Sequence, residues 1–171
     1  MNTVEERISR LHAGGVIDLH FDLPLSLFLS QGRGTIVATD FLPEFEAGDI
    51  SLLGVALYVE DAYLGEQALR IALDQVALLK AELESTPRLV LCRSFAEIEK
   101  AQAEGRIALL LTMEGAEPLG DDLKLLQIFH ELGLRSISLT HARENAAGAG
   151  GIFAASGSPA YGLTSFGRGL V

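Results

Sequence analysis

The chain lacks the features that would place it in several large classes of protein. Its single cysteine, Cys92, permits no internal disulfide bond, which fits a reducing compartment. It has no run of about 18 uninterrupted apolar residues, so we expect no membrane-spanning helix and no membrane partner. Charged residues at 5–7 occupy the stretch where an export signal needs an apolar core, so we expect a cytoplasmic protein.

Basic residues are also scarce. The 171 residues include 13 Lys and Arg against 23 Asp and Glu, which gives a formal net charge of -10. Neutralising phosphates requires Lys and Arg, so this balance argues against a nucleic-acid partner. The hydrophobic content of 49% and charged content of 21% are those of a folded chain with a sizeable core, and we expect one domain over residues 1–171.

Apolar runs alternate with stretches of helical periodicity. Strands separated by helices of 10–20 residues are typical of βαβ units, so the pattern predicts an α/β fold with a parallel sheet of about five strands. The predicted strands are 16–20, 50–60, 88–92, 106–115 and 134–141, and the predicted helices are 64–84, 94–105 and 121–132.

Three further segments have weaker patterns. Residues 30–40 are polar and contain glycine, so we expect a loop with little regular structure. The Gly/Ala-rich segment 146–159 is expected to be a mobile loop, and loops after strand ends often line active sites, so a functional role stays open. Residues 162–171 are typical of a helix start. A complete eight-unit barrel needs roughly 250 residues, so we expect the chain to be part of a longer repeating architecture.

The first candidate site residues are His20 and Asp22, at the end of the first apolar run. Residues i and i+2 of a strand point to the same face, so this imidazole and carboxylate can hold one divalent metal ion together. Alternatively, His20 is an ordinary strand-end residue and Asp22 caps a turn before Pro24. Cys92 is interpreted as a small residue at a strand end rather than as a nucleophile.

Glu114 and His141 follow two later apolar runs. A carboxylate at the end of a buried strand is costly unless it is paired or bound to metal. The carboxyl ends of parallel strands meet at one edge of a barrel, where catalytic residues gather, so all four residues are expected to lie together. His141 would contact substrate or stabilise an oxyanion; alternatively it bonds only to loop backbone. His12 and His130 are interpreted as ordinary helix residues.

At these residues the sequence resembles the membrane (renal-type) dipeptidase family, the M19 metallopeptidases of the amidohydrolase superfamily. The chain differs from the frequent family pattern at Phe21 and at Ala116-Glu117, which adjoin the ligand positions. The matching segments are VIDLHFDLP at 16–24, LTMEGAEPLGDDLKLLQIFHELGLRSISLTH at 111–141, Asn145, and GLTSFGRGLV at 162–171.

The resemblance implies a partial TIM-like (β/α) barrel with about the first five strands and their helices. It implies a site for two Zn²⁺ ions, in which His20 and Asp22 bind the first zinc and Glu114 bridges both. It also implies that His141 contacts substrate and steadies the tetrahedral intermediate. The reaction would be hydrolysis of a dipeptide by a metal-bridging hydroxide.

The resemblance also implies that part of the site lies elsewhere. The family takes two more zinc-binding histidines, a catalytic aspartate and a substrate-binding arginine from its second half, so residues 1–171 match the N-terminal portion of one barrel domain. We therefore expect the isolated chain to be nearly inactive. Two alternatives remain, namely another amidohydrolase reaction such as N-acyl amino acid hydrolysis, and a non-catalytic half-barrel. The chain would associate with the missing half or form a homo-oligomer.

Overall fold

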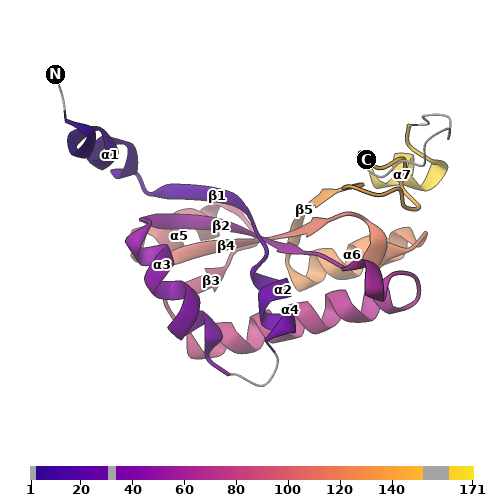
Figure 1. Ribbon diagram of the computed structural model, residues 1–171, viewed down its shortest axis with the longest axis horizontal. Coiled ribbons are helices and arrows are strands. Elements are labelled where there is room, and N and C mark those ends of the chain that lie inside the picture. Colours follow the sequence, from indigo (N-terminus) through magenta and orange to yellow (C-terminus); the bar gives the residue numbers. More distant parts are fainter. Residues whose placement is uncertain (1–2, 31–33, 152–161) are drawn as a thin grey trace.

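A computed structural model of the chain describes residues 3–30, 34–151 and 162–171, and its central feature is a parallel sheet of five strands (Figure 1). This confirms the α/β class and the parallel sheet predicted from the sequence. Each predicted strand is present, with ends shifted by up to three residues. The strands are β1 (Val16–Phe21), β2 (Ile50–Leu57), β3 (Leu89–Leu91), β4 (Ile107–Glu114) and β5 (Leu134–Ser138).

Helices occupy most of the connections between strands. The three predicted helices correspond to α4, α5 and α6, and the predicted helix start near the end of the chain corresponds to α7. The α-helices are α1 (Val4–His12), α2 (Leu23–Leu29), α3 (Leu42–Ala47), α4 (Gln67–Ser85), α5 (Phe95–Ala103), α6 (Leu123–Leu132) and α7 (Ser165–Leu170); a π-helical segment η1 (Val37–Phe41) and 3-10 segments η2 (Asp61–Tyr63) and η3 (Glu117–Leu119) complete the set.

The prediction of an irregular loop at 30–40 was wrong for its second half, where η1 begins at Val37. The amide groups of Ile36 and Val37 donate to the carboxylate of Glu82 on α4, at 3.3 and 3.0 Å. A helix start satisfied by a carboxylate 45 residues away has no local signature, which is why the sequence did not reveal it. Residues 31–33 and 152–161 lie outside the described residues, so most of the predicted loop 146–159 is not described.

The strands are not arranged in simple chain order. β1 pairs with β2, and β2 pairs directly with β4 from Leu52–Ala108 to Leu57–Met113. The other side of β4 carries β3 along its first half and β5 along its second half. At the carboxyl edge of the sheet the neighbouring strands are therefore β1, β2, β4 and β5. β3 flanks β4 only near the amino edge.

Side-chain alternation divides β2 and β4 between two faces. Odd-numbered residues such as Val55 and Leu111 are fully buried in the main core, where α4 contributes Ala72, Val76 and Leu79. Even-numbered residues lie on the opposite face, which near the amino edge packs on α5 and buries Cys92. This burial agrees with the interpretation of Cys92 as a small strand-end residue.

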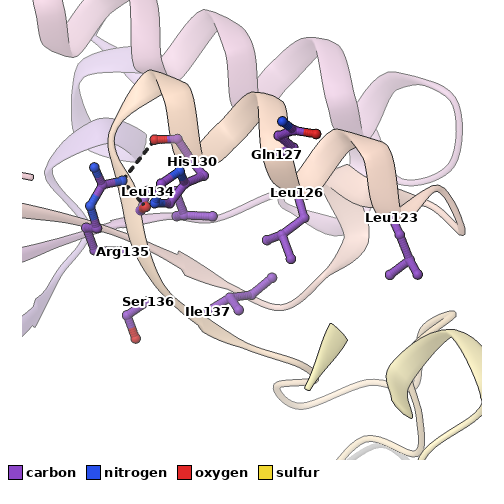
Figure 2. Close-up of a pocket in the computed structure, with 8 residues that line it drawn as sticks. All are labelled: Leu123, Leu126, Gln127, His130, Leu134, Arg135, Ser136 and Ile137. Carbon is purple, nitrogen blue, oxygen red and sulfur yellow. Dashed lines mark hydrogen bonds between the residues drawn. The ribbon is translucent and has the colours of Figure 1, made fainter. Parts of the chain in front are cut away.

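Several large apolar side chains are exposed among the described residues, including Ile8 and Leu11 of α1 and Ile17 and Leu19 of β1. Figure 1 shows α1 standing apart from the sheet, and none of its residues is buried. A cavity of about 490 Å³ lies along α6 and β5, and the residues that line it (Figure 2) are Leu123, Leu126, Gln127, His130, Leu134, Arg135, Ser136 and Ile137. No helix within the described ranges is long and apolar enough to cross a bilayer.

Candidate metal centre

His20 and Asp22 lie at the carboxyl end of β1. His20 belongs to the strand, and Asp22 follows it as the N-cap residue of α2. The Asp22 side chain makes no capping hydrogen bond to α2, contrary to the alternative interpretation of Asp22 as a structural cap. Its Oδ1 instead lies 3.8 Å from Nε2 of His20, and both side chains are about half exposed, at 48% and 55%.

Glu114 is the last residue of β4, two strands away from β1 in the sheet order. Its side chain is only 12% exposed, and its Oε2 lies 3.0 Å from Nε2 of His20. The backbone turns sharply after it: Gly115 has a φ of +81°, and a Cβ at that position would collide with the carboxylate of Glu117. Glycine therefore permits the turn that leaves Glu114 at the strand end.

These three side chains form a group that could hold a metal ion. One ligand atom from each of His20, Asp22 and Glu114 lies within 4.8 Å of the others. Ligands at about 2.0–2.2 Å from a tetrahedral zinc ion stand roughly 3.3–3.6 Å from one another, so little movement would be needed to place an ion between them. One imidazole and two carboxylates are also donors that Zn²⁺ accepts.

His141 joins this group from the segment after β5. Its Nδ1 lies 2.8 Å from Oε1 of Glu114, so the two carboxylate oxygens each face a different histidine. The alternative in which His141 contacts only loop backbone is therefore incorrect. The structure thus brings together all four residues that the sequence singled out, whereas His12 lies on α1, paired with Asp49 at 3.0 Å.

A charged group that the sequence did not single out lies beside the site. Arg143 is 16% exposed, and its Nε lies 3.1 Å from Oε1 of Glu117, which is 8% exposed; the alignment is not that of a hydrogen bond. Its other nitrogens donate to the hydroxyl of Tyr58, the carboxylate of Asp61 and the carbonyl of Val59. Burial lowers the pKa of Arg143, but the Tyr58 hydrogen bond and the nearby anionic groups outweigh it and raise the pKa above its ordinary value.

Tyr58 directly follows β2 and lies between Arg143 and His141. The Arg143 guanidinium lies 5.4 Å from the centre of the Tyr58 ring, and the His141 ring stands at 84° to that ring with 6.2 Å between centres. The fully buried Gln75 of α4 accepts from the Tyr58 amide at 3.2 Å and donates to its carbonyl at 2.5 Å. The backbone, the ring and the hydroxyl of Tyr58 are thus all held by other residues.

Sequence reasoning missed Tyr58, Gln75 and Arg143. Tyr58 was within the predicted strand 50–60, and Gln75 was a single polar residue within a helix that otherwise has an apolar face. The available signal was positional, because Tyr58 and Arg143 each follow a strand at the same edge as the predicted ligands.

Comparisons with known proteins find relatives of this chain in both sequence and fold. The family model of the membrane dipeptidases, peptidase family M19, matches residues 5–171. A crystal structure described as dipeptidase AC, a metallopeptidase of family M19, superposes with a TM-score of 0.83 at 32% identity over 92% of this chain. A metallopeptidase from Rhodobacter sphaeroides, liganded with a phosphinate mimic of the dipeptide L-Ala-D-Ala, gives 0.78 at 30% identity over 91% of the chain.

Among curated proteins, Dipeptidase 3 of Rattus norvegicus is 30% identical over 147 residues, which is 80% of this chain. An uncharacterized protein of Acinetobacter calcoaceticus is 34% identical over 108 residues. The chain spans 52% and 54% of the two metallopeptidase structures and only 29% to 34% of these curated relatives. The match over nearly the whole chain, together with the fold, shows that the chain belongs to the membrane dipeptidase family, peptidase family M19.

Proposed function

We propose that this chain carries part of the active site of a zinc-dependent dipeptidase, which hydrolyses the peptide bond of a dipeptide. The observation that carries the proposal is the cluster of His20, Asp22 and Glu114 within 4.8 Å at the carboxyl edge of a parallel sheet. Bound zinc would supply a Lewis acid and a water molecule of lowered pKa. His20 and Asp22 would be ligands of the first zinc, and Glu114 would bridge the first and second.

His141 has a separate role in this proposal. With Nδ1 directed at Glu114, Nε2 is the nitrogen left for substrate, and when both ring nitrogens carry a proton it can donate to the oxygen of a substrate carbonyl as negative charge develops there. Arg143 is a poor candidate for binding the substrate carboxylate, because Tyr58, Asp61 and Val59 already accept from its terminal nitrogens.

The site is proposed to be completed by residues outside this chain's 171. Among the described residues, only Glu114 is a proposed ligand of the second zinc, and the chain spans about half of the metallopeptidase structures that it resembles. The uncovered apolar surfaces support this view: Ile17 and Leu19 of β1 are 58% and 66% exposed, and the apolar cavity of Figure 2 lies along β5 at the opposite end of the strand path. A polypeptide supplying further β/α units would cover both.

A cytoplasmic location belongs to the same proposal and is supported by the lone cysteine.

The test uses the chain alone and together with the missing half. With added Zn²⁺, the 171-residue chain is expected to bind about one zinc per molecule and to hydrolyse dipeptides barely or not at all. Adding a polypeptide that supplies the remaining family segments is expected to bring the zinc content to two and to give dipeptide hydrolysis. Robust turnover by the chain alone, or a reconstituted protein with two zincs and no hydrolysis, would contradict the proposal. N-acyl amino acids belong in the same panel, and their preferential hydrolysis would replace the dipeptidase assignment.

A further inference from the structure

We propose that Tyr58 is a positioning residue for His141, and that Arg143 acts on the site through Tyr58. The inference rests on the proposed role of His141 and deepens it. It assigns functions to two partly buried residues outside the proposed set of metal ligands.

The rings of Tyr58 and His141 are in direct contact. The Tyr58 and His141 rings meet edge to face, 6.2 Å apart and at 84°. This is the arrangement that aromatic quadrupoles favour, so the Tyr58 ring disfavours rotation of the imidazole away from Glu114. The other anchor of His141 is its 2.8 Å contact with Oε1 of Glu114. Two anchors at different points of the ring fix its plane as well as its position.

Tyr58 is itself held by Gln75 and Arg143. Its amide and carbonyl are both bonded to the buried side chain of Gln75, which fixes the backbone where β2 ends. The Tyr58 hydroxyl accepts a hydrogen bond from Nη1 of Arg143 at 3.1 Å, and the guanidinium lies against the ring. Tyr58 is therefore held at both ends, and its ring has little freedom to follow a moving His141.

Arg143 connects several segments around Tyr58 and His141. It follows His141 by two residues, and it joins the loop after β5 to Val59 and Asp61, which follow β2. Its buried Nε faces Glu117 after β4, which balances the buried charge. Because one guanidinium joins the ends of three neighbouring strands, its loss would free Tyr58 first and His141 through it.

The test compares Tyr58→Phe, Tyr58→Leu and Arg143→Lys in the 171-residue chain. Matched controls are Tyr63→Leu, whose ring packs on Phe28 instead, and Arg88→Lys, which pairs with Glu46. The first readout is the nuclear Overhauser effect between the ring protons of residue 58 and His141. We expect this effect in the wild type and in both controls. We expect the nuclear Overhauser effect to weaken at least about twofold in Arg143→Lys. We expect a smaller decrease in Tyr58→Phe, because this variant keeps the ring and loses only the hydroxyl. An unchanged signal in Arg143→Lys would overturn the role of Arg143.

The second readout is Zn²⁺ affinity in a double-mutant cycle with His141→Ala. Zinc affinity reports on His141 because His141 contacts Glu114, a proposed zinc ligand. Tyr58→Leu is expected to weaken zinc binding by roughly 2- to 10-fold, as expected for the loss of one aromatic contact, and to have no further effect when His141 is already alanine. An equal loss in both backgrounds would mean general damage to the fold and would overturn the proposal. If Tyr58→Leu does not fold, Tyr58→Phe and Arg143→Lys decide by the first readout. That readout needs no metal or substrate, so it stands apart from any failure of the proposed function.

Discussion

Nδ1 of His141 lies 2.8 Å from Oε1 of Glu114, which links the segment after β5 to the last residue of β4. The other oxygen of Glu114 faces His20 at 3.0 Å. A single carboxylate that is only 12% exposed thus connects the ends of three strands. The facing atoms, Nε2 of His20 and Oε2 of Glu114, are both able to bind a metal ion. An ion could therefore bind between these two side chains with little rearrangement.

Replacing His20 with asparagine is expected to weaken Zn²⁺ binding by more than about 100-fold. This loss exceeds the one typical for a residue that only hydrogen-bonds to a metal ligand. The imidazole supplies the only nitrogen of the three-residue cluster. The matched control is His12→Asn, because His12 lies on α1 and pairs with Asp49. Zinc titration by calorimetry checks both variants. Equal weakening in the two, or none in either, would mean that His20 is not a ligand.

Replacing Gln75 with leucine is expected to destabilise the fold by about 1–3 kcal/mol. The change leaves the amide and carbonyl of Tyr58 without the partner that both now use. The exposed Gln102 of α5 provides the control, and Gln102→Leu is expected to change stability by less than about 0.5 kcal/mol. Urea unfolding followed by circular dichroism gives both values. A Gln75→Leu variant as stable as the wild type would show that Gln75 does not hold the strand end.

Replacing Gly115 with alanine is expected to cost about 2–3 kcal/mol of stability. Its φ of +81° disfavours any side chain, and the added Cβ would meet the Glu117 carboxylate. Gly14→Ala serves as the control, because nothing lies within 4 Å of a Cβ there. Thermal unfolding of the two variants side by side tests the difference. If both shift the midpoint equally, the turn after Glu114 does not require glycine.

The sequence predicted that the four candidate residues lie together because each stands at or just after the end of an apolar run that forms a strand. In a parallel sheet that position alone places the side chains at one edge. Tyr58 and Arg143 follow strands at the same edge, but their roles depend on a contact across 85 residues. Neither residue carries a pattern that pairs it with the other. The short helix at 37–41 was missed for the same reason, since Glu82 of α4 satisfies its start.

Cys92 gives a prediction about pH. Burial raises the pKa of its thiol above the ordinary value of 9.0, so the folded chain favours the neutral thiol. Well below pH 9.0 the thiol is protonated in both states and its contribution to stability is complete. Above pH 9.0 the unfolded chain ionises first, so this contribution is lost as pH rises through the folded pKa.

The comparison of wild type with Cys92→Ala measures that contribution. The difference in unfolding free energy between the two proteins is expected to be constant up to about pH 8 and to change in favour of Cys92→Ala at higher pH. In native protein the thiol is also expected to react slowly with a disulfide reagent, since its exposure is 0%. A constant difference through pH 11, or fast native reaction, would mean that the thiol is accessible.

The central claim is that Glu114, with His20 and Asp22, forms a metal site, and zinc calorimetry on Glu114→Gln tests it most directly. Glutamine keeps the shape of the side chain and removes its charge, and the exposed Glu131→Gln on α6 is the control. The account predicts about one zinc per wild-type chain, a loss of more than about 100-fold in affinity for Glu114→Gln, and none for Glu131→Gln. Unchanged zinc affinity in Glu114→Gln would contradict it.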